Sequence, residues 1–467
     1  MNTAHIRDYK HKVIHMIGIG GSSMSGLAEM LLELGYQVRG SDGAESYVVD
    51  MLREKGIAVT VGHSASNVFG ADLIIYTAAI AEDNIERATA REQGIPCMER
   101  KTLLGQIMEH YRCNVCICGT HGKTTTSAMA AKALLDAGLD PSVHIGGAAD
   151  SIGGSTRLGS EELFVAEACE FNASFMSMNP HIAVLMNVKE DHLDFYKDIE
   201  DIENSFRAFL NKLPQEGWVI ACGDDARAAR LAEEHQNHIL FGFDPAKNDY
   251  YPQHIRFDEA GCAGFDLYHR GEKLCHIQLI VPGEIQVLDA IAAFAAAKLL
   301  QADTAAVVAS LESFGGVHRR FELTGIYDGV KVYHDYGHNP EEMLQVLQTA
   351  KRLPHKRLWA VMQPHTYSRV KRLFRDYIHC TEPADITLVT DICAAREKDP
   401  GDIHSTDLIR AMQAERVNAV YTPSFDDTEE YLKAHWQPGD IVVTMGCGDI
   451  NKLNIQMEKH AHQHRAL

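Results

Sequence analysis

Residues 115–126 read VCICGTHGKTTT, an apolar run that ends in a glycine-rich turn, and the segment SAMAAKALLDAG that follows has the composition of a helix. Strand, turn and helix in this order form a phosphate-binding loop, because backbone N–H groups at the helix start point at the anion. The lysine supplies positive charge, and a threonine hydroxyl can ligate Mg²⁺. Ile117 stands where the strict Walker pattern has glycine, so the loop is shorter than usual. We expect phosphate binding by Gly119, Thr120, His121, Gly122, Lys123, Thr124 and Thr125.

Two acidic stretches downstream come at the ends of further apolar runs. Residues 164–170 read FVAEACE, and residues 187–194 read NVKEDHLD. The carboxyl ends of parallel strands face one crevice, so these side chains are expected to meet the phosphate loop. Carboxylates are natural ligands of Mg²⁺. The predicted metal-nucleotide site therefore combines Thr124 with Glu167 and His192, and it has Glu170 as a further carboxylate.

A second glycine turn lies near the N-terminus, where residues 17–26 read IGIGGSSMSG and Asp42 follows at the end of the next expected strand. The pattern resembles a dinucleotide fingerprint, in which glycines admit a pyrophosphate and an acidic residue meets a ribose hydroxyl. Ser23 stands where the third glycine belongs, so the pattern is weak evidence for NAD. Another nucleotide diphosphate fits the same chemistry, and a glycine turn that only packs a helix is the remaining alternative.

Three times an apolar strand runs into a glycine turn and an amphipathic helix, which predicts an α/β fold with parallel sheets. We expect three domains: a Rossmann-like domain over residues 1–109, a central P-loop domain with a mixed sheet over 110–316, and a doubly wound Rossmann-like domain over 317–467. Residues 254–283 alternate apolar and polar side chains, as an antiparallel flank of the central sheet would.

Charged and aromatic side chains follow the expected strands of the third domain. Residues 335–340 read DYGHNP and residues 363–369 read QPHTYSR, and Arg319 and Arg320 lie a little upstream. Arginine and histidine at such strand ends can bind carboxylate or phosphate. Taken without the other domains, His338 and His365 fit structural roles better than catalytic ones.

Composition narrows the classes of function. The 467 residues carry 44 Lys and Arg against 64 Asp and Glu, a formal net charge of −20, which argues against general binding to nucleic acid or anionic membranes. No apolar run is long enough to cross a membrane, and the first residues do not resemble a signal peptide. We therefore expect a cytoplasmic protein with reduced cysteines and no obligatory protein partner.

Taken together, the motifs resemble those of the Mur ligases. The matching segments occur in order along the whole chain, and they read GIGGSSMSGLAEML, GTHGKTTT, EACEFNASF, NVKEDHLDFY, HRRFE, HDYGHNPEEM, QPHTYSR and DICAAREK. The resemblance implies ATP-dependent formation of an amide bond in peptidoglycan precursor synthesis, with ATP and Mg²⁺ as cofactors and UDP-N-acetylmuramate and L-alanine as substrates. The first domain would hold the UDP-sugar and the second MgATP, and the third would close over ATP and the amino acid.

The resemblance also implies roles for single residues. Catalytic roles fall to Lys123, His192, Glu167 and Arg320. Thr124 and Glu167 would hold one Mg²⁺ and His192 a second, while Asp335 would contact the ribose of ATP and Arg319 or Arg320 its phosphates. The UDP moiety would lie against Gly18, Gly20, Gly21, Ser22, Ser23, Gly26, Ser41 and Asp42. The muramate carboxylate and the incoming amine would lie near His338, His365, Tyr367 and Arg369.

The sequence departs from the family pattern at several positions. The segment PGEIQVLDA has Ile285, Gln286 and Asp289 where the family has a histidine and two asparagines close to the nucleotide. A carboxylate at position 289 is therefore expected to be compensated, either by turning from the phosphates or by pairing with Lys or Arg. EACEFN, DYGHNP and QPHTYSR also differ from the usual motifs.

Three other functions remain open from the sequence. A ligase that joins UDP-N-acetylmuramate to a preformed tripeptide would share nearly every motif. The first domain could belong to a nicotinamide-dependent dehydrogenase, although Ser23 and the adjoining ATP loop argue against this. The chain could also be a binding protein that resembles a ligase and has lost turnover.

Overall fold

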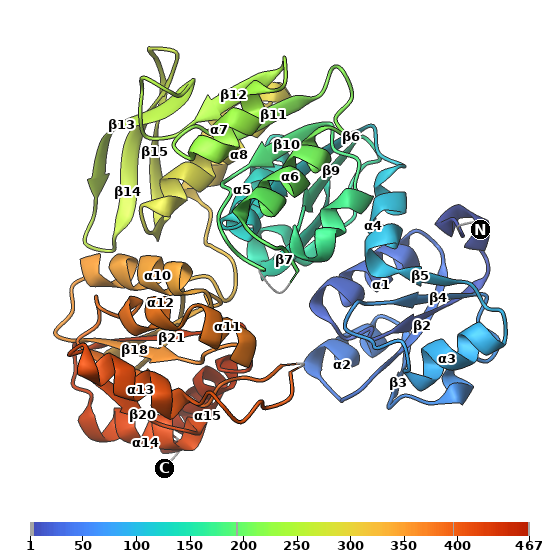
Figure 1. The fold of residues 1–467 in the computed structure, drawn as a ribbon. Coiled ribbons are helices and arrows are strands. Elements are labelled where there is room, and N and C mark those ends of the chain that lie inside the picture. The colour runs from blue at the N-terminus through green and yellow to red at the C-terminus, as the bar shows by residue number, and fades with distance from the viewer. Residues whose placement is uncertain (1–3, 193–194, 396, 466–467) are drawn as a thin grey trace. The chain divides into compact units, whose positions relative to one another are not determined.

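The structure, a computed structural model, describes residues 4–192, 195–395 and 397–465 (Figure 1). The described residues form three sheets flanked by helices, of five, ten and six strands in chain order. The predicted α/β class with three successive sheets is confirmed. Among the described residues, no helix is both long and apolar enough to cross a membrane.

The first sheet is fully parallel and has the order β3-β2-β1-β4-β5. Buried side chains of α1 and α4 cover one face, including Leu27, Leu31 and Leu103, and Val68 and Ala90 belong to the core on the other. The strands are β1 (Val13–Ile17), β2 (Gln37–Asp42), β3 (Ala58–Val61), β4 (Leu73–Tyr76) and β5 (Cys97–Glu99). The helices are η1 (Ile6–Tyr9), α1 (Ser22–Glu33), α2 (Tyr47–Glu54), η2 (Ala65–Val68), α3 (Ile85–Glu92) and α4 (Arg100–Met108).

The second sheet is mixed, as predicted, and has the order β15-β14-β13-β12-β11-β10-β6-β9-β7-β8. Its strands are β6 (Cys113–Cys118), β7 (Ser142–Ala149), β8 (Gly154–Arg157), β9 (Leu163–Glu167), β10 (Ile182–Leu185), β11 (Trp218–Cys222), β12 (His238–Phe241), β13 (Tyr250–Phe257), β14 (Cys262–His269) and β15 (Glu272–Pro282). Its helices are α5 (Lys123–Asp136), η3 (Asp150–Ile152), η4 (Phe171–Ser177), α6 (Ile199–Leu210), α7 (Ala226–Glu233), α8 (Ile285–Leu299) and α9 (Thr304–Glu312). The alternating segment from residue 254 contributes to three strands that are neighbours at one side of this sheet.

Strand β6 lies between β9 and β10, and all three run parallel. The register pairs Ile117 with Glu167 on one side and Cys118 with Leu185 on the other. The carboxyl ends of the three strands therefore lie at one edge, where α5 begins at Lys123. This arrangement places the glycine turn and both acidic segments together, as the strand-end argument predicts.

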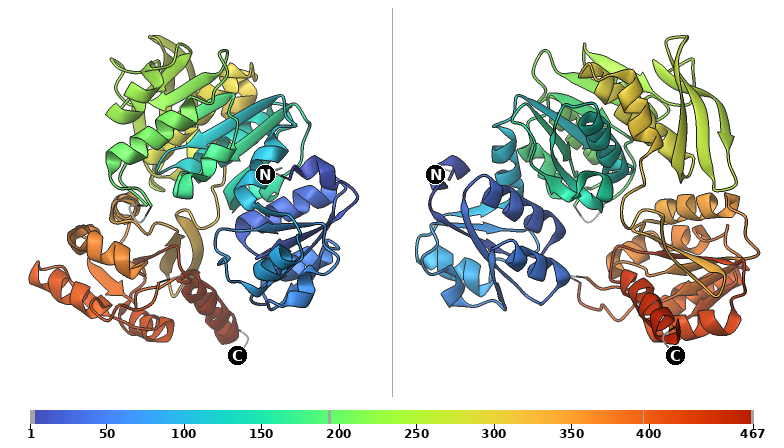
Figure 2. Two further views of the ribbon diagram at one scale, coloured as in Figure 1. Left: turned by 45° about the vertical axis from the view of Figure 1, so that its right-hand side comes forward. Right: turned by 180° about the vertical axis from the view of Figure 1, so that it is seen from behind.

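The third sheet has the order β16-β17-β21-β18-β19-β20, and only β16 runs antiparallel to its neighbour. Two hydrophobic cores cover its faces, one with α10 and α12 and the other with α14 and α15; Figure 2 shows the helices on both sides. The strands are β16 (Glu322–Tyr327), β17 (Val330–Asp335), β18 (Leu358–Met362), β19 (Ile386–Val389), β20 (Ala419–Tyr421) and β21 (Ile441–Met445). The helices are α10 (Pro340–Arg352), α11 (Tyr367–Arg372), α12 (Phe374–His379), α13 (Ser405–Ala414), α14 (Phe425–His435) and α15 (Asn451–Arg465).

By its internal contacts the chain divides into two compact units. The first unit contains residues 1–254, 265–277 and 287–315, and the second contains residues 255–264, 278–286 and 316–467. The first sheet and strands β6 to β12 lie in the first unit, whose buried core continues from one sheet to the other, while β13, β14 and β15 have residues in both units. The predicted domain boundaries after residues 109 and 316 fall in segments between sheets and stay predictions.

Gly26 lies where α1 packs against strand β8 of the same unit. A Cβ atom added at Gly26 would lie 2.0 Å from Oγ1 of Thr156, closer than any real contact. Glycine is therefore required for this close approach of helix and strand, which is the packing role left open for the glycine turn.

We predict that Gly26→Ala lowers the stability of the full chain by ~1–3 kcal/mol, because the added methyl group forces α1 away from β8. Thermal unfolding of the purified variant measures this effect. Gly315→Ala is the matched control, since a Cβ there meets no atom within 4 Å. Equal melting temperatures for the Gly26 variant and the unmodified protein would contradict the packing argument.

Candidate functional site: a phosphate loop in a parallel sheet

The glycine turn between β6 and α5 has the backbone that an anion-binding loop needs. Gly119 and Gly122 have φ of 132° and 85°, values that side chains with a Cβ rarely adopt. A Cβ on Gly119 would also come within 3.0 Å of the backbone of Asn187. The N-terminal end of α5 follows directly, with Thr124, Thr125 and the rest of its first turn buried. The predicted loop residues 119–125 thus lie together.

The segment after β10 holds the loop in shape. Asn187 accepts a hydrogen bond from His121 N at 2.9 Å and donates one to His121 O at 3.1 Å through its side chain. Its carbonyl oxygen accepts from Thr120 N at 3.2 Å. The Thr120 hydroxyl accepts from Lys189 N at 2.9 Å. Asn187 was not among the predicted site residues, although it begins the NVKEDHLD segment.

Lys123 is almost fully buried, and its ammonium group binds back onto the loop and the neighbouring strand end. Nζ donates to Gly119 O at 2.6 Å and Thr120 O at 2.8 Å, and it lies 2.9 Å from a carboxylate oxygen of Glu170. Burial alone would lower the pKa of Lys123, but the negative charges of Glu170 and Glu167 outweigh it and raise that pKa. Lys123 is thus a fixed positive charge beneath the loop.

His192 lies on the other side of the same carboxylate. Its Nε2 atom is 3.6 Å from Oε1 of Glu170, and its ring packs on Phe171 with centroids 4.8 Å apart. The backbone of His192 is left-handed, with φ of 50°, and its buried Nδ1 has no hydrogen-bond partner in the described part of the chain. A buried nitrogen without a hydrogen-bond partner, on a residue with a strained backbone, is typical of a ligand-binding residue.

Glu167 ends β9 next to the loop, and one of its carboxylate oxygens accepts a hydrogen bond from Gly146 N at 2.8 Å. Within the described residues, no group of three or more His, Cys, Asp or Glu side chains could hold a metal by itself. Mg²⁺ does not need such a cage, because it keeps waters and binds through one or two carboxylates plus substrate phosphates. The Glu167 carboxylate and the Thr124 hydroxyl are oxygen donors of the kind that Mg²⁺ prefers, and the buried Nδ1 of His192 is a nitrogen donor with no partner among the described residues.

The unusual Asp289 lies directly under the loop. It is buried, its Oδ1 accepts a hydrogen bond from the Thr126 hydroxyl at 2.8 Å, and it lies 3.1 Å from where a Cβ of Gly122 would be. The positive N-terminal end of α5 also favours a carboxylate here. The sequence led us to expect that this carboxylate either turns from the phosphates or pairs with Lys or Arg, and the hydrogen bond from the Thr126 hydroxyl is a contact that the sequence did not indicate. Gln286 has a buried Oε1 that no described group satisfies.

The glycine turn of the first sheet wraps around the end of β2. The Ser41 carbonyl oxygen accepts from Gly18 N at 2.8 Å and Ile19 N at 3.0 Å, while Asp42 accepts from Gly20 N at 2.8 Å through its carboxylate. The turn is therefore shaped by the two residues predicted to accompany it.

Helix α1 begins directly after this turn. The backbone of Ser22 opens the helix behind Gly21, and the Ser22 side chain lies outside the described residues. The Ser23 hydroxyl is 2.8 Å from Nε2 of His144, and it accepts a hydrogen bond from Arg100 at 2.9 Å. Burial lowers the pKa of His144 to about 3, so its ring is neutral. Neither Arg100 nor His144 was predicted.

In the second unit, Asp335 ends β17 and is buried. Its carboxylate accepts from Phe321 N at 2.8 Å and Gly337 N at 2.6 Å, which joins the two predicted motifs 319–322 and 335–340. Burial raises the pKa of Asp335, although Arg320 opposes the effect. The guanidinium groups of Arg319 and Arg320 both lie over the Tyr336 ring, 4.8 and 5.1 Å from its centroid. Two guanidinium groups over one ring beside a strand end can bind an anion.

The other predicted residues of this unit also gather at strand ends. The rings of His338 and His365 have centroids 5.9 Å apart, and Arg369 lies 3.3 Å from Nδ1 of His365. Asn339, which departs from the family pattern, caps α10 by accepting from Glu341 N at 3.1 Å. This capping role is favourable for asparagine and explains the substitution locally.

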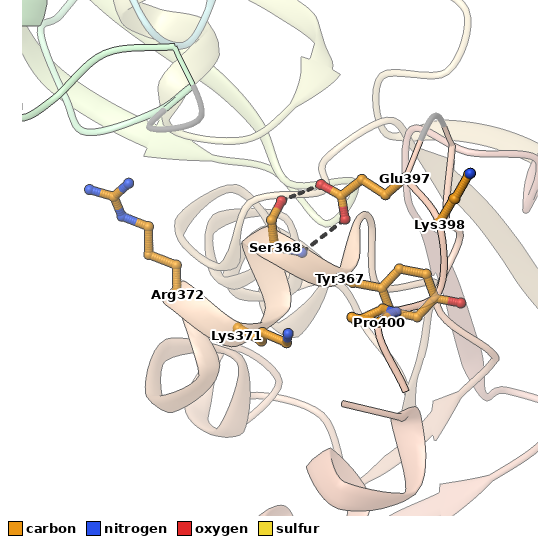
Figure 3. Close-up of a pocket in the computed structure, with 7 residues that line it drawn as sticks. All are labelled: Tyr367, Ser368, Lys371, Arg372, Glu397, Lys398 and Pro400. Carbon is orange, nitrogen blue, oxygen red and sulfur yellow. Dashed lines mark hydrogen bonds between the residues drawn. The ribbon is translucent and has the colours of Figure 1, made fainter. Parts of the chain in front are cut away.

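Tyr367 borders a surface hollow of about 590 Å³ (Figure 3). Figure 3 shows Glu397 bound to the hydroxyl and the N–H group of Ser368, and Arg372 and Lys398 extending away from it. The hydrogen bonds from Ser368 and its neighbours lower the pKa of Glu397 despite the opposing effect of burial. The full lining is Tyr367, Ser368, Lys371, Arg372, Glu397, Lys398 and Pro400.

Comparison with known proteins agrees with these features. Three family models match along the chain: "Mur ligase family, catalytic domain" over residues 13–112, "Mur ligase middle domain" over 117–297, and "Mur ligase, glutamate ligase domain" over 319–448. The chain belongs to the Mur ligase family. Members of this family are ATP-dependent ligases that form amide bonds, and this Mur ligase is such an enzyme.

Similarity to named proteins shows which members of the Mur ligase family this chain resembles. The chain is 45% identical to UDP-N-acetylmuramate–L-alanine ligase of Acetivibrio thermocellus over 95% of each chain. Among solved structures, UDP-N-acetylmuramate-alanine ligase MurC from Thermotoga maritima matches with a TM-score of 0.84 and 26% identity, over 97% of this chain and all of that one. The murein peptide ligase mpl from Psychrobacter arcticus has a TM-score of 0.73 at 22% identity, with 96% and 98% covered, which shows the fold alone.

We predict that Asp289→Asn leaves the KM of this Mur ligase for ATP within about threefold, on the order of 0.6 kcal/mol. The amide oxygen can still accept from Thr126, and the carboxylate is already compensated there. Steady-state kinetics with varied ATP measure this value. A fall of tenfold or more in KM would mean that the native carboxylate repels the phosphates.

Proposed function

We propose that this Mur ligase joins L-alanine to the muramate carboxylate of UDP-N-acetylmuramate, with ATP and Mg²⁺, in the synthesis of peptidoglycan precursors. The observation that carries the proposal is the buried Lys123–Glu170 pair beneath a glycine loop, with Glu167 at the end of β9 and His192 in the segment after β10. The identity of 45% to a UDP-N-acetylmuramate–L-alanine ligase supports the choice of substrates. The tripeptide ligase is less favoured, because its solved relative is less similar. A cytoplasmic location remains our expectation.

The central site suits transfer of the γ-phosphoryl group of ATP to a carboxylate. Backbone N–H groups of the loop and the start of α5 would hold the phosphates, and Lys123 would neutralise their charge as transfer proceeds. Mg²⁺, when bound, would supply positive charge that stabilises the phosphate oxygens. Thr124 and Glu167 would hold one ion and His192 a second. The muramate carboxylate would then become an acyl phosphate.

The residues of the other sheets would bring the remaining groups to the reaction. The turn 18–23 with Ser41 and Asp42 would hold the UDP moiety, with Gly26 behind it. Arg319, Arg320 and Asp335 would contact ATP. His338, His365, Tyr367 and Arg369 would surround the muramate carboxylate and the amine, which displaces phosphate from the acyl phosphate. Holding these groups in place lowers the barrier, because the reaction becomes effectively unimolecular.

The direct test is phosphate release from ATP by the full chain with UDP-N-acetylmuramate and a panel of amino acids. We expect L-alanine to give the highest kcat/KM, and release to require the UDP-sugar. A clear preference for the tripeptide L-alanyl-γ-D-glutamyl-meso-diaminopimelate would contradict the proposal in favour of the peptide ligase. Absence of turnover with every acceptor would indicate a protein that binds its ligands without catalysis.

A second test concerns the metal. Glu167→Gln should raise the Mg²⁺ concentration needed for half-maximal activity at least several-fold, because one charged ligand is lost. The melting temperature without ligands should change little, since Gly146 N can still donate to the amide oxygen. A large loss of stability with an unchanged Mg²⁺ requirement would instead give Glu167 a structural role.

A further inference from the structure

A fully buried carboxylate lies beneath the glycine turn of the first sheet. The side chain of Glu86, near the start of α3, has no exposed surface. It is 2.7 Å from Nε2 of His15 and 2.9 Å from Nδ1 of His63, and it accepts hydrogen bonds from the Ser41 hydroxyl at 2.8 Å and Asn67 Nδ2 at 2.9 Å. Each carboxylate oxygen therefore has two partners from different segments of the chain.

The four partners keep the carboxylate charged. Burial by itself would raise the pKa of Glu86, but hydrogen bonds from His15, Asn67, Ser41 and His63 outweigh it and lower that pKa to about 2. Burying a charged carboxylate costs free energy through lost solvation, and the four hydrogen-bond partners offset that cost here. The residues that bind Glu86 indicate which part of the first sheet it positions.

Two of these partners lead directly to the predicted UDP site. The Ser41 hydroxyl binds Glu86, and the Ser41 carbonyl oxygen accepts the N–H groups of Gly18 and Ile19 in the glycine turn. Asn67 donates to Glu86 and also to the carbonyl oxygen of Gly62 at 3.0 Å. Gly62 N in turn donates to the carbonyl oxygen of Asp42 at 2.8 Å.

His63 is the member of the cluster that reaches the edge of the sheet. It lies two residues beyond β3, whose last residue, Val61, pairs with Asp42. Its side chain is 25% exposed, and Nε2 is 3.9 Å from where a Cβ of Gly43 would be, in the segment after Asp42. A carboxylate can only accept, so Nδ1 of His63 carries a proton toward Glu86, and Nε2 is the ring nitrogen that is left to meet a ligand.

We propose that Glu86 is a positioning residue for the nucleotide diphosphate, which fixes the glycine turn through Ser41 and orients His63 so that Nε2 accepts a hydrogen bond from the nucleoside. This rests on the proposed function, in which the first domain binds the UDP-sugar. The group that meets Nε2 must be a donor. In uridine diphosphate these donors are the ribose hydroxyls and the N3–H of the base.

Glu86→Gln in the full chain tests the positioning role. The amide keeps the size of the side chain but turns an N–H₂ group toward two of the four donors, so the cluster must rearrange. We expect the Kd for UDP and the KM for UDP-N-acetylmuramate to rise about tenfold or more, while the KM for ATP stays the same. Calorimetry or fluorescence gives the Kd, and steady-state kinetics give the KM values.

Glu203→Gln is the matched control, because Glu203 is a buried carboxylate of the central domain that pairs with Arg207 and Arg230 at 2.9 and 2.6 Å. It should lower the melting temperature without changing the Kd for UDP. If Glu86→Gln also lowers only the melting temperature, Glu86 is structural and the inference is wrong. If it raises the KM for ATP as much as that for the UDP-sugar, the effect is a general loss of folding and the inference is equally wrong.

His63→Ala tests the contact with the nucleoside. We expect the variant to bind UDP more weakly and to discriminate less well between UDP and one of its analogues. If His63 contacts the base, the variant should lose the preference for UDP over CDP, which lacks N3–H. If His63 contacts the ribose, the variant should lose the preference for UDP over its 2′- and 3′-deoxy forms. An unchanged affinity and unchanged selectivity would overturn the role of His63.

Binding of UDP by the unmodified chain separates this inference from the proposed function. If that chain does not bind UDP, both the proposed substrate and the role of Glu86 are wrong. If it binds UDP and Glu86→Gln binds it equally well, the proposed function stands and only the role of Glu86 is overturned.

Discussion

The buried ammonium group of Lys123 is the constraint on which the central domain depends. A charge at this depth needs compensation, and it receives two loop carbonyls and the carboxylate of Glu170. Removing one partner of such a pair commonly costs about 3–5 kcal/mol, because the other charge stays buried. The lysine therefore holds its own loop and the end of β9 together. Phosphate oxygens that arrive at the loop meet a positive charge already in place, so little reorganisation is needed.

Other charged residues are arranged around the buried Lys123. Glu170 connects Lys123 to His192, so the ends of β9 and of the segment after β10 are coupled through one carboxylate. Asp289 lies close to Gly122 and accepts a hydrogen bond from the Thr126 hydroxyl in the first turns of α5. Several carboxylates therefore lie close to a loop that is suited to phosphates. This arrangement fits a nucleotide that binds together with Mg²⁺, because the cation offsets the negative charges. The net charge of the whole chain, −20, matters less here than the local pairing.

The sequence predicted those features that depend on neighbouring residues. The phosphate loop, its strand and its helix are a local pattern, and so are the strands β17 and β18, which were expected before the segments DYGHNP and QPHTYSR. Contacts between distant segments were not accessible in this way. Asn187 clamps His121 only because β10 lies beside β6, and Gly26 is needed only because α1 meets β8. The Glu86 cluster joins residues between positions 15 and 86, and no spacing rule indicates such a group. The hydrogen bond from Thr126 to Asp289 likewise joins residues that are far apart in the sequence, and no sequence pattern indicates it.

The most direct test of the account follows the oxygen atoms of the reaction. UDP-N-acetylmuramate labelled with ¹⁸O in the muramate carboxylate is incubated with ATP, Mg²⁺, L-alanine and the full chain. If the carboxylate takes the γ-phosphoryl group and the amine then displaces phosphate, one labelled oxygen must leave with the phosphate, and mass spectrometry of inorganic phosphate will detect it. Amide product accompanied by unlabelled phosphate would contradict transfer of the phosphoryl group at the Lys123 loop to the substrate carboxylate.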